Sequence, residues 1–354
     1  MRHMPNAVID PKQIISGLDQ LKSTGIVDLI KSDLHQPNQN GDSVITYVLH
    51  GEFDFIGGPR WLFHDRRHVA INSMEKRSNL AYIDNVHSMM GGPRWGNELK
   101  SFQSYDSNQK IQELPEMNLC NITTKWSQVN IYHSIYDSFA KLEVMSRIGN
   151  IEKYTYLVPR NARLLSDLLE ESGLQVMEYI PNKIYRGLMY VPSMPGAIGN
   201  TSYSVYDFLR SRFSHIKCAE RNRIIYITRK NSGKRRILNE DELLRNLKSK
   251  HAFDVLELEN MTISEQIRAF KEAKCVIAPH GAGLSWIAFM SAGNVIEIDS
   301  PFYTNGCFKS ISRNNDRIIH SILKGKQHES ADGVSSQDYE VDIDEIMHKL
   351  DSLI

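Results

Sequence analysis

The feature that most constrains the fold is a regular alternation of short apolar strands with helices, which starts near residue 129 and runs to about residue 300. Strands are expected at 154–159, 174–180, 184–191, 223–228, 253–258, 275–278 and 294–299, and helices at 130–148, 161–172, 203–217, 239–250 and 262–273. Strands separated by helices of ten or more residues pair in parallel through crossover connections. The sequence therefore predicts an α/β protein built on parallel sheets.

The length of 354 residues exceeds what one hydrophobic core usually supports, so two domains are expected. The Pro/Gly-rich segment VPSMPGAIGNTS at 191–202 is the best candidate for a hinge. We expect an N-terminal domain over 1–195, a C-terminal domain over 196–330, and a C-terminal helix within 331–354 that packs back on the domains. The acids Asp342 and Asp344 suit the start of that helix better than a metal site.

The first 120 residues carry a weak helix signal at 12–22 and short β-prone pieces separated by Gly and Pro. The pentapeptide GGPRW occurs twice, at 57–61 and 91–95. Two interpretations stay open: two similar turns, or Arg and Trp side chains that stack on the sugars of an acceptor. The candidates for acceptor binding are Arg60, Trp61, Arg94 and Trp95.

The charge balance limits the partners. The chain has 42 basic and 42 acidic residues, so it has no overall field to attract nucleic acid or an anionic membrane, and any anion must bind at a local site. The four cysteines are widely spaced and suit reduced core thiols. The N-terminal stretch has no long apolar run, which predicts a soluble, cytoplasmic protein without a membrane span.

The stretch CVIAPHGAGLSWIAFMSAGNVIEID at 275–299 is the strongest candidate for a binding site. A buried strand runs into His280, then Gly281 and Gly283 allow a tight turn, and an apolar helix over 284–292 is expected to end at Gly293. Exposed amides at the start of a helix suit a phosphate. A merely tight turn with a packed histidine remains the alternative.

Three stretches then occur in an informative order: NIYHSIYD at 130–137, RIIYITRKNSGKRRILNEDEL at 223–243, and TISEQIRAFKEAKCVIAPHGAGLSWIAFMSAGNVIEI at 262–298. Together they resemble glycosyltransferase family 61, which includes capsular-polysaccharide, protein-xylosyl and N-acetylglucosaminyl transferases. The resemblance covers about residues 120–300. Ser285-Trp286 and Ser291-Ala292 depart from the family pattern in the donor pocket.

The resemblance implies a GT-B architecture, in which two Rossmann-like domains face each other across a cleft. It also implies an inverting transfer from a UDP-sugar, such as UDP-xylose or UDP-N-acetylglucosamine, to a hydroxyl of a glycan acceptor, with no metal. The family assigns the ribose hydroxyls to Glu297, for which a strand-end charge facing water is the alternative. The remaining expected donor-binding residues are Arg229, Lys230, His280, Gly281, Ala282, Gly283 and Leu284. For Arg229 and Lys230 a solvated basic loop is the alternative.

Inversion in one displacement also needs a base that takes the proton of the acceptor hydroxyl. His133 and Asp137 are four residues apart on one helical face and match the family's H-x-x-x-D/E element. We expect Asp137 as the base with His133 orienting it, and the reverse assignment and an ordinary exposed pair stay open. Two other functions are considered: a non-catalytic nucleotide-sugar or glycan binding protein on the same fold, and a phospho-sugar transferase.

Overall fold

The computed structural model describes residues 110–124, 130–181, 183–193, 195–197, 200–327 and 337–354, together with the backbone of strands β1 to β8. The chain divides into two compact units, unit 1 (Met1–Val205) and unit 2 (Tyr206–Ile354). The predicted boundary between residues 195 and 196 lies at the start of a short hairpin, formed by β14 (Gly196–Ala197) and β15 (Asn200–Thr201), which comes just before this division. The division itself lies inside helix α6 (Tyr203–Arg212).

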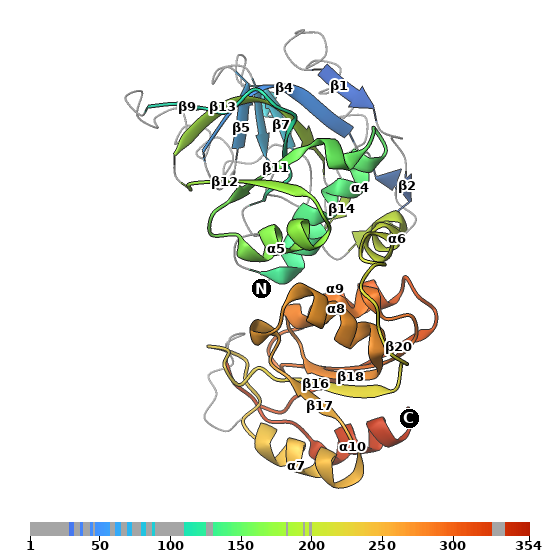
Figure 1. The fold of residues 1–354 in the computed structure, drawn as a ribbon. Coiled ribbons are helices and arrows are strands. Elements are labelled where there is room, and N and C mark those ends of the chain that lie inside the picture. The colour runs from blue at the N-terminus through green and yellow to red at the C-terminus, as the bar shows by residue number, and fades with distance from the viewer. Residues whose placement is uncertain are drawn as a thin grey trace. The chain divides into compact units, whose positions relative to one another are not determined.

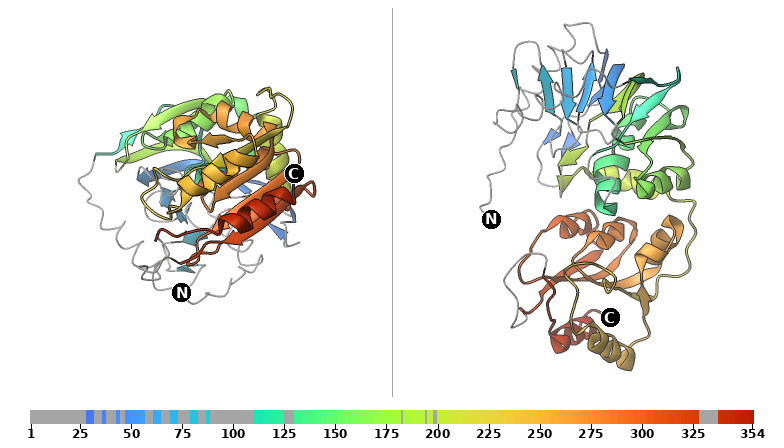
Figure 2. Two further views of the ribbon diagram at one scale, coloured as in Figure 1. Left: turned by 90° about the horizontal axis from the view of Figure 1, so that it is seen from below. Right: turned by 90° about the vertical axis from the view of Figure 1, so that its left-hand side faces the viewer.

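Unit 2 is a five-stranded, fully parallel sheet covered by helices on both faces (Figures 1 and 2). The strand order in the sheet is β17-β16-β18-β19-β20. The strand of unit 2 that comes first in the chain, β16, therefore lies between β17 and β18. In such doubly wound sheets the chain leaves in opposite directions on either side of the switch point, and ligands bind outside the carboxyl ends of the strands there. In unit 2 this point lies between β16 and β18. The elements are β16 (Arg223–Ile227), α7 (Glu240–Lys250), β17 (Asp254–Leu256), η4 (Leu258–Asn260), α8 (Ile263–Glu272), β18 (Ala273–Pro279), η5 (Ala282–Phe289), β19 (Gly293–Asp299), α9 (Cys307–Ser312), β20 (Ile318–Lys324) and α10 (Ile343–Asp351).

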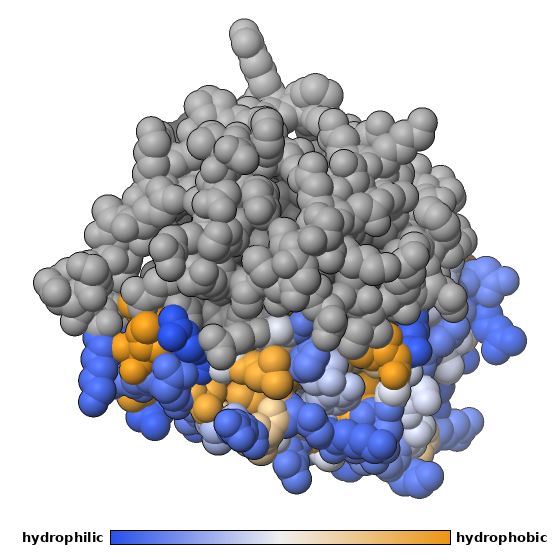
Figure 3. Space-filling view, turned by 90° about the horizontal axis from the view of Figure 1, so that it is seen from above, coloured by the Kyte–Doolittle hydropathy of each residue, from blue (hydrophilic) through white to orange (hydrophobic). Residues whose placement is uncertain are grey.

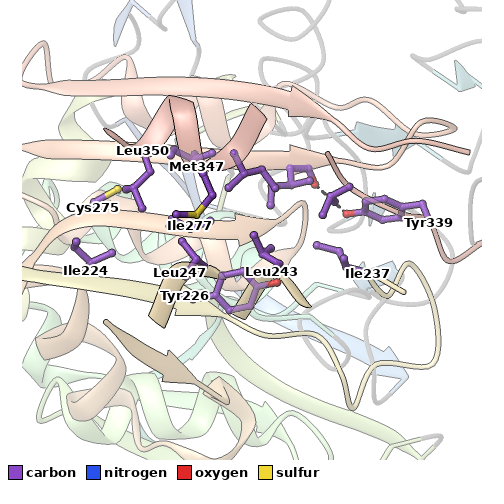
Figure 4. Packing of buried hydrophobic residues seen from close by; sticks show 14 residues of the cluster. Ile224, Tyr226, Ile237, Leu243, Leu247, Cys275, Ile277, Tyr339, Met347 and Leu350 are labelled. Atoms are coloured by element: carbon purple, nitrogen blue, oxygen red, sulfur yellow. Dashed lines mark hydrogen bonds between the residues drawn. The ribbon is translucent and has the colours of Figure 1, made fainter. Parts of the chain in front are cut away.

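One face of this sheet packs against α7 and α10, as Figure 4 shows. Leu243 and Leu247 of α7 and Leu350 of α10 are fully buried in this core. The hydroxyl of Tyr339 donates to the carbonyl of Ile298 at 3.1 Å, which fixes the segment before α10 to the sheet. The predicted C-terminal helix is therefore part of unit 2.

Helix starts in unit 2 follow local signals in the sequence. Thr262 and Glu265 form the expected capping box at α8, with the Thr262 hydroxyl accepting from the Glu265 amide at 3.3 Å. The Asp342 carboxylate accepts from the Glu345 amide at 3.1 Å, so it caps α10.

The segment after the glycine turn differs from the prediction. It forms the 3₁₀ helix η5 (Ala282–Phe289), and Gly293 begins β19 with a φ of 127° instead of ending a helix. Side chains from Leu284 to Phe289 are all buried, so tertiary packing on every side decides the backbone here. A second difference concerns Cys218, which is exposed, whereas Cys120, Cys275 and Cys307 are buried thiols.

Unit 1 is built on a mixed sheet. Strands β10, β11 and β12 pair in parallel, β13 pairs in parallel with β10, and β13 pairs antiparallel with β4, which leads into the antiparallel strands β5 to β8. The short connections between β4 and β8 favour antiparallel neighbours, so only the β10–β13 part has the expected strand-helix alternation. Its elements are β1 (Asp28–Lys31), β2 (Gln36–Pro37), β3 (Ser43–Val44), β4 (Tyr47–Ile56), β5 (Trp61–His64), β6 (Val69–Asn72), β7 (Asn79–Tyr82), β8 (His87–Ser88), β9 (Gln112–Glu113), β10 (Leu119–Asn121), α3 (Ile131–His133), η2 (Ser134–Phe139), α4 (Lys141–Ser146), η3 (Ile151–Lys153), β11 (Thr155–Pro159), α5 (Arg163–Glu171), β12 (Gln175–Tyr179) and β13 (Ile184–Pro192).

On the face shown in Figure 3, hydrophilic side chains predominate and apolar side chains lie in separate groups. Among the helices of the described residues, none is long and apolar enough to cross a bilayer. The predicted helix at 12–22 and the candidate acceptor residues Arg60, Arg94 and Trp95 lie outside the described residues, as does the side chain of Trp61.

Candidate functional site

The carboxyl edge of the unit 2 sheet gathers most of the predicted donor-binding residues. Arg229 follows β16, and His280 and Gly281 follow β18. These two strands are neighbours that flank the switch point, so the fold brings the two segments together although they are about 50 residues apart in the chain.

The guanidinium of Arg229 lies directly on Gly281. A Cβ at Gly281 would be 2.2 Å from Nη1 of Arg229, so only a glycine permits this contact. Nη2 donates to the Ser232 hydroxyl at 2.9 Å and to the Lys234 carbonyl at 3.3 Å, whereas Nε is buried and has no partner in the described part of the chain. Burial and the nearby Arg235 lower the pKa of Arg229. A buried cation with an unsatisfied donor is a ready partner for an anion.

Arg235 is a second cation at this edge. From the sequence alone it is only one member of the basic segment that follows β16. Its φ of 56° lies in the left-handed region, which is uncommon for a residue with a side chain and is a reason to suspect function. The guanidinium carbon lies 4.9 Å from the centre of the Tyr303 ring, and Nε is again buried without a partner among the described residues.

Two other basic residues of this run, Lys230 and Arg236, are neutralised by carboxylates. Lys230 forms an ion pair with Glu257, which raises the pKa of the lysine, and its side chain is 56% exposed. Arg236 binds Asp338 through two nitrogens at 2.6 and 2.9 Å. The described residues give neither Arg229 nor Arg235 a carboxylate partner, so those two cations remain available to a ligand.

The turn after β18 supplies amides beside these cations. The amide of Leu284 donates to the Gly281 carbonyl at 3.0 Å, so it is already used within the turn. The described residues offer no acceptor for the amides of Ala282 and Gly283, which are only half-buried. Gly281 itself is buried, because the Arg229 guanidinium covers it. The reachable amides are therefore those of Ala282 and Gly283.

Glu297 does not face water, which removes the alternative of an exposed strand-end charge. It is fully buried, and each carboxylate oxygen has a histidine partner: Oε1 lies 2.5 Å from His280 Nδ1, and Oε2 lies 2.8 Å from His320 Nε2. Burial would raise the pKa of Glu297, but the hydrogen bonds from the two histidines outweigh it and lower the pKa. Both oxygens that the ribose would need are thus occupied.

In unit 1, His133 and Asp137 form the predicted pair. The Asn130 side chain accepts from the Tyr132 amide at 2.8 Å and starts α3. The chain then continues as the π-helical segment η2, a rare form found often at functional sites. His133 Nδ1 lies 2.6 Å from Asp137 Oδ2. The Asp137 side chain is only 2% exposed against 20% for His133, so this is not an ordinary exposed pair.

The surroundings of Asp137 are buried and polar. Oδ1 of Asp137 has no partner in the part of the chain that the structure describes. Lys141, one turn further on, is 2% exposed, and burial lowers its pKa to about 8 although the Asp137 charge opposes the shift. At the carboxyl end of β10, Thr123 Oγ1 donates to Asn121 Oδ1 at 2.7 Å, and Thr124 Oγ1 lies 3.3 Å from Ser138 Oγ. The Thr124–Ser138 contact joins the end of β10 to the residue that follows Asp137.

Sequence reasoning missed several of these residues. Lys141 could have been found, because it continues the four-residue spacing from His133 and Asp137 on one helical face. Asp299, whose Oδ1 lies 3.3 Å from His280 Nδ1, could also have been found, since it points to the same face of β19 as Glu297 two residues earlier. For His320 and Tyr303 the sequence holds no comparable signal.

Comparison with known proteins supports the motif reading. The glycosyltransferase 61 family model matches residues 131–296, a span that contains His133, Asp137, Arg229 and the turn after β18. One relative is the EGF domain-specific O-linked N-acetylglucosamine transferase of Drosophila melanogaster, which is 24% identical over 192 residues. That match covers 50% of this chain and 36% of the relative, so it spans about a third of the relative's length. Over residues 131–296 the chain is thus similar to glycosyltransferase family 61, and the resemblance predicted from the motifs is confirmed over that part of the chain.

Proposed function

We propose that the chain is an inverting glycosyltransferase of GT-B architecture that moves a sugar from a UDP-sugar to a hydroxyl of a glycan acceptor. Unit 2 binds the donor, and unit 1 supplies the base. The observation that carries this proposal is the buried Arg229 guanidinium, with an unsatisfied Nε, packed on Gly281 at the switch point of a parallel sheet. The name of the Drosophila relative favours N-acetylglucosamine over xylose as the sugar.

In this scheme the diphosphate lies against the carboxyl edge of β16 and β18. Arg229 and Arg235 donate to its oxygens, and the amides of Ala282 and Gly283 add two backbone donors. As the bond between the anomeric carbon and the phosphate oxygen breaks, negative charge builds up on the departing diphosphate. Fixed cations stabilise that charge without a metal, so none is assigned to the reaction.

For the base we favour His133, with Asp137 positioning it, which reverses the assignment expected from the sequence. Asp137 is nearly inaccessible, and its Oδ2 holds Nδ1 of His133, whose side chain keeps the greater exposure. The acceptor oxygen attacks the anomeric carbon while its proton passes to His133, and the Asp137 carboxylate stabilises the imidazolium that forms. The nearby Lys141 balances the buried carboxylate when its amine is protonated.

The first experiment is a thermal-shift series with UDP, GDP, CDP, UDP-N-acetylglucosamine and UDP-xylose. A ligand present at 100 times its Kd should stabilise the protein by about 2.7 kcal/mol. We expect UDP and one UDP-sugar to raise the Tm and the other diphosphates to have smaller effects. No shift with any nucleotide would contradict the proposal.

The second experiment separates an enzyme from a binding protein on the same fold. His133→Ala and Asp137→Asn should abolish release of UDP from the UDP-sugar while leaving the Kd for UDP unchanged, because both residues lie in unit 1. If the wild-type protein binds UDP-sugar but releases nothing with a panel of glycan acceptors, the chain is a binding protein. Release of UMP in place of UDP would indicate a phospho-sugar transferase.

A further inference from the structure

A series of buried hydrogen bonds connects α9, β20 and β19 of unit 2 to the turn after β18. Ser312 Oγ lies 2.5 Å from His320 Nδ1, and His320 Nε2 lies 2.8 Å from Glu297 Oε2. Glu297 Oε1 lies 2.5 Å from His280 Nδ1, which ends the series one residue before Gly281. All four side chains are at most 6% exposed. The proposed reaction gives no role to this series of hydrogen bonds.

These contacts fix the position of the His280 ring from the side that faces Glu297. Burying an ionised carboxylate is costly unless each oxygen is paired, and here two histidines from different elements provide the pairing. The His280 ring is further held by the Tyr303 ring, at 5.1 Å between centres, and the Phe308 ring, at 4.9 Å. Because Nδ1 faces Glu297, Nε2 points to the opposite side of the ring, away from the carboxylate.

A second carboxylate strengthens the case for a proton on Nδ1. Asp299 Oδ1 lies 3.3 Å from His280 Nδ1, and Asp299 Oδ2 lies 3.2 Å from Lys324 Nζ. Burial would lower the pKa of His280, but the Asp299 and Glu297 carboxylates outweigh it and raise the pKa. Of the titratable and charged groups around this ring, Glu297, Asp299 and Tyr303 face it directly. Cys307 lies near the two carboxylates, and the Arg229 guanidinium lies on the next residue, Gly281.

We propose that Glu297, backed by His320 and Ser312, is a positioning residue that keeps His280 doubly protonated, so that Nε2–H donates to the diphosphate of the donor. Glu297 then acts through His280 and does not bind the ribose. The identity of the anion rests on the proposed function, whereas the coupling of Glu297 to His280 does not. His280 thereby joins Arg229 and Arg235 as the third cation at the switch point.

A bound metal ion would exclude this arrangement. His280, Glu297 and Asp299 each offer a ligand atom, and these atoms lie within 4.8 Å of one another. A metal on Nδ1 would take the place of the proton, because ligation requires the ring nitrogen to be deprotonated. A measurement of whether His280 Nδ1 carries a proton therefore decides between the proposed arrangement and a metal site.

The first test needs no nucleotide. Proton–nitrogen correlation spectra of the histidine rings, recorded from pH 5 to 9 on the ligand-free protein, give the midpoint at which His280 loses a proton. We expect Glu297→Gln to lower this midpoint by at least about one pH unit, equivalent to a tenfold change in the protonation equilibrium. Ser312→Ala, at the far end of the series, should shift it in the same direction by less, and it serves if Glu297→Gln does not fold.

The matched control is Glu272→Gln. Glu272 is also a buried carboxylate of unit 2, but it accepts from Arg223 and the Ala219 amide at the other edge of the sheet. This variant should leave the His280 midpoint unchanged. An unchanged midpoint in both Glu297→Gln and Ser312→Ala, or a metal-type shift of Nδ1 on adding Zn²⁺, Mn²⁺ or Mg²⁺ to the wild type, overturns the proposal.

The second test measures the ratio of the UDP Kd values of Glu297→Gln and wild type at each pH, which cancels the titration of UDP itself. We expect a ratio near one at acid pH, where His280 is protonated in both proteins. The ratio should rise above the lowered midpoint and reach about tenfold or more once the pH also exceeds the wild-type midpoint. A ratio that is high and independent of pH assigns Glu297 to the ribose and overturns the proposal. If wild type binds no UDP, the proposed function fails, while the ring titration still decides the coupling.

Discussion

Gly281→Ala offers a sharp test, because the structure says what the added methyl group would meet. The new Cβ would lie 2.2 Å from Nη1 of Arg229, whereas ordinary contact begins at 3.4 Å. The backbone of Gly281 is extended, with a φ of 177°, so alanine fits it without strain. The guanidinium must move by about 1 Å or more, and a misplacement of this size is enough to weaken a charged hydrogen bond strongly.

The expected loss follows from the value of such a bond. A hydrogen bond to a charged group contributes about 1.5–3 kcal/mol, so displacement of Arg229 should raise the Kd for UDP about 10- to 150-fold. Isothermal titration of UDP into wild type, Gly281→Ala and Gly306→Ala measures this directly. Gly306 is the control, because a Cβ there meets no heavy atom within 4 Å, and its Kd should not change.

A double-mutant cycle shows whether the effect passes through the arginine. Gly281→Ala should add almost nothing to Arg229→Ala, since the methyl group then has no guanidinium to displace. If Gly281→Ala binds UDP as tightly as wild type, or if the two losses add in full, the effect at Gly281 does not pass through Arg229 and the reasoning is refuted.

Three further predictions concern other parts of the molecule. Lys141→Met should remove a pH dependence of the free energy of unfolding. Burial lowers the pKa of Lys141 from 10.5 to about 8, so the unfolded state binds more protons than the folded state between these two pH values. The free energy of unfolding of wild type should therefore rise by roughly 3 kcal/mol relative to that of the variant between pH 8 and 10.5. Parallel urea titrations at several pH values measure this, and a constant difference would refute it. Thr262→Ala should cost about 1 kcal/mol through loss of the capping box and should speed amide exchange in α8, while exchange in α7 stays unchanged; equal exchange in α8 would contradict the cap. Trp286→Phe should cost roughly 1–3 kcal/mol, because it leaves Gln266 Oε1 buried without its 2.6 Å donor, and a Tm equal to that of wild type would refute this.

Local signals in the sequence were enough for most of the α/β elements. The strand-helix alternation located β11, β12, β13, β16, β17, β18 and β19, and the Thr262 and Asp342 signals located two helix starts. These features depend on neighbours in the chain, as amphipathic patterns and caps do. The pairing of β13 with β4 brings together segments more than 100 residues apart, so no local pattern reports it.

The residues of the candidate site also fall into those that local sequence patterns predict and those that depend on distant parts of the chain. Arg229, His280 and Gly281 could be predicted, because the carboxyl ends of parallel strands share one edge. The partners of Glu297 could not be predicted, because His320 lies on β20 and no sequence pattern links it to the turn after β18. The burial of Asp137 was also beyond the sequence, because it depends on elements that pack on η2, among them α5.

The most direct test of the central claim is to observe the turn after β18 while UDP binds. Amide proton–nitrogen spectra of the protein, recorded during a UDP titration, should show the largest changes at Ala282 and Gly283 and at the Arg229 side chain, all saturating with one Kd. Saturable UDP binding that leaves these signals unmoved, with changes centred elsewhere in the chain, would contradict the account.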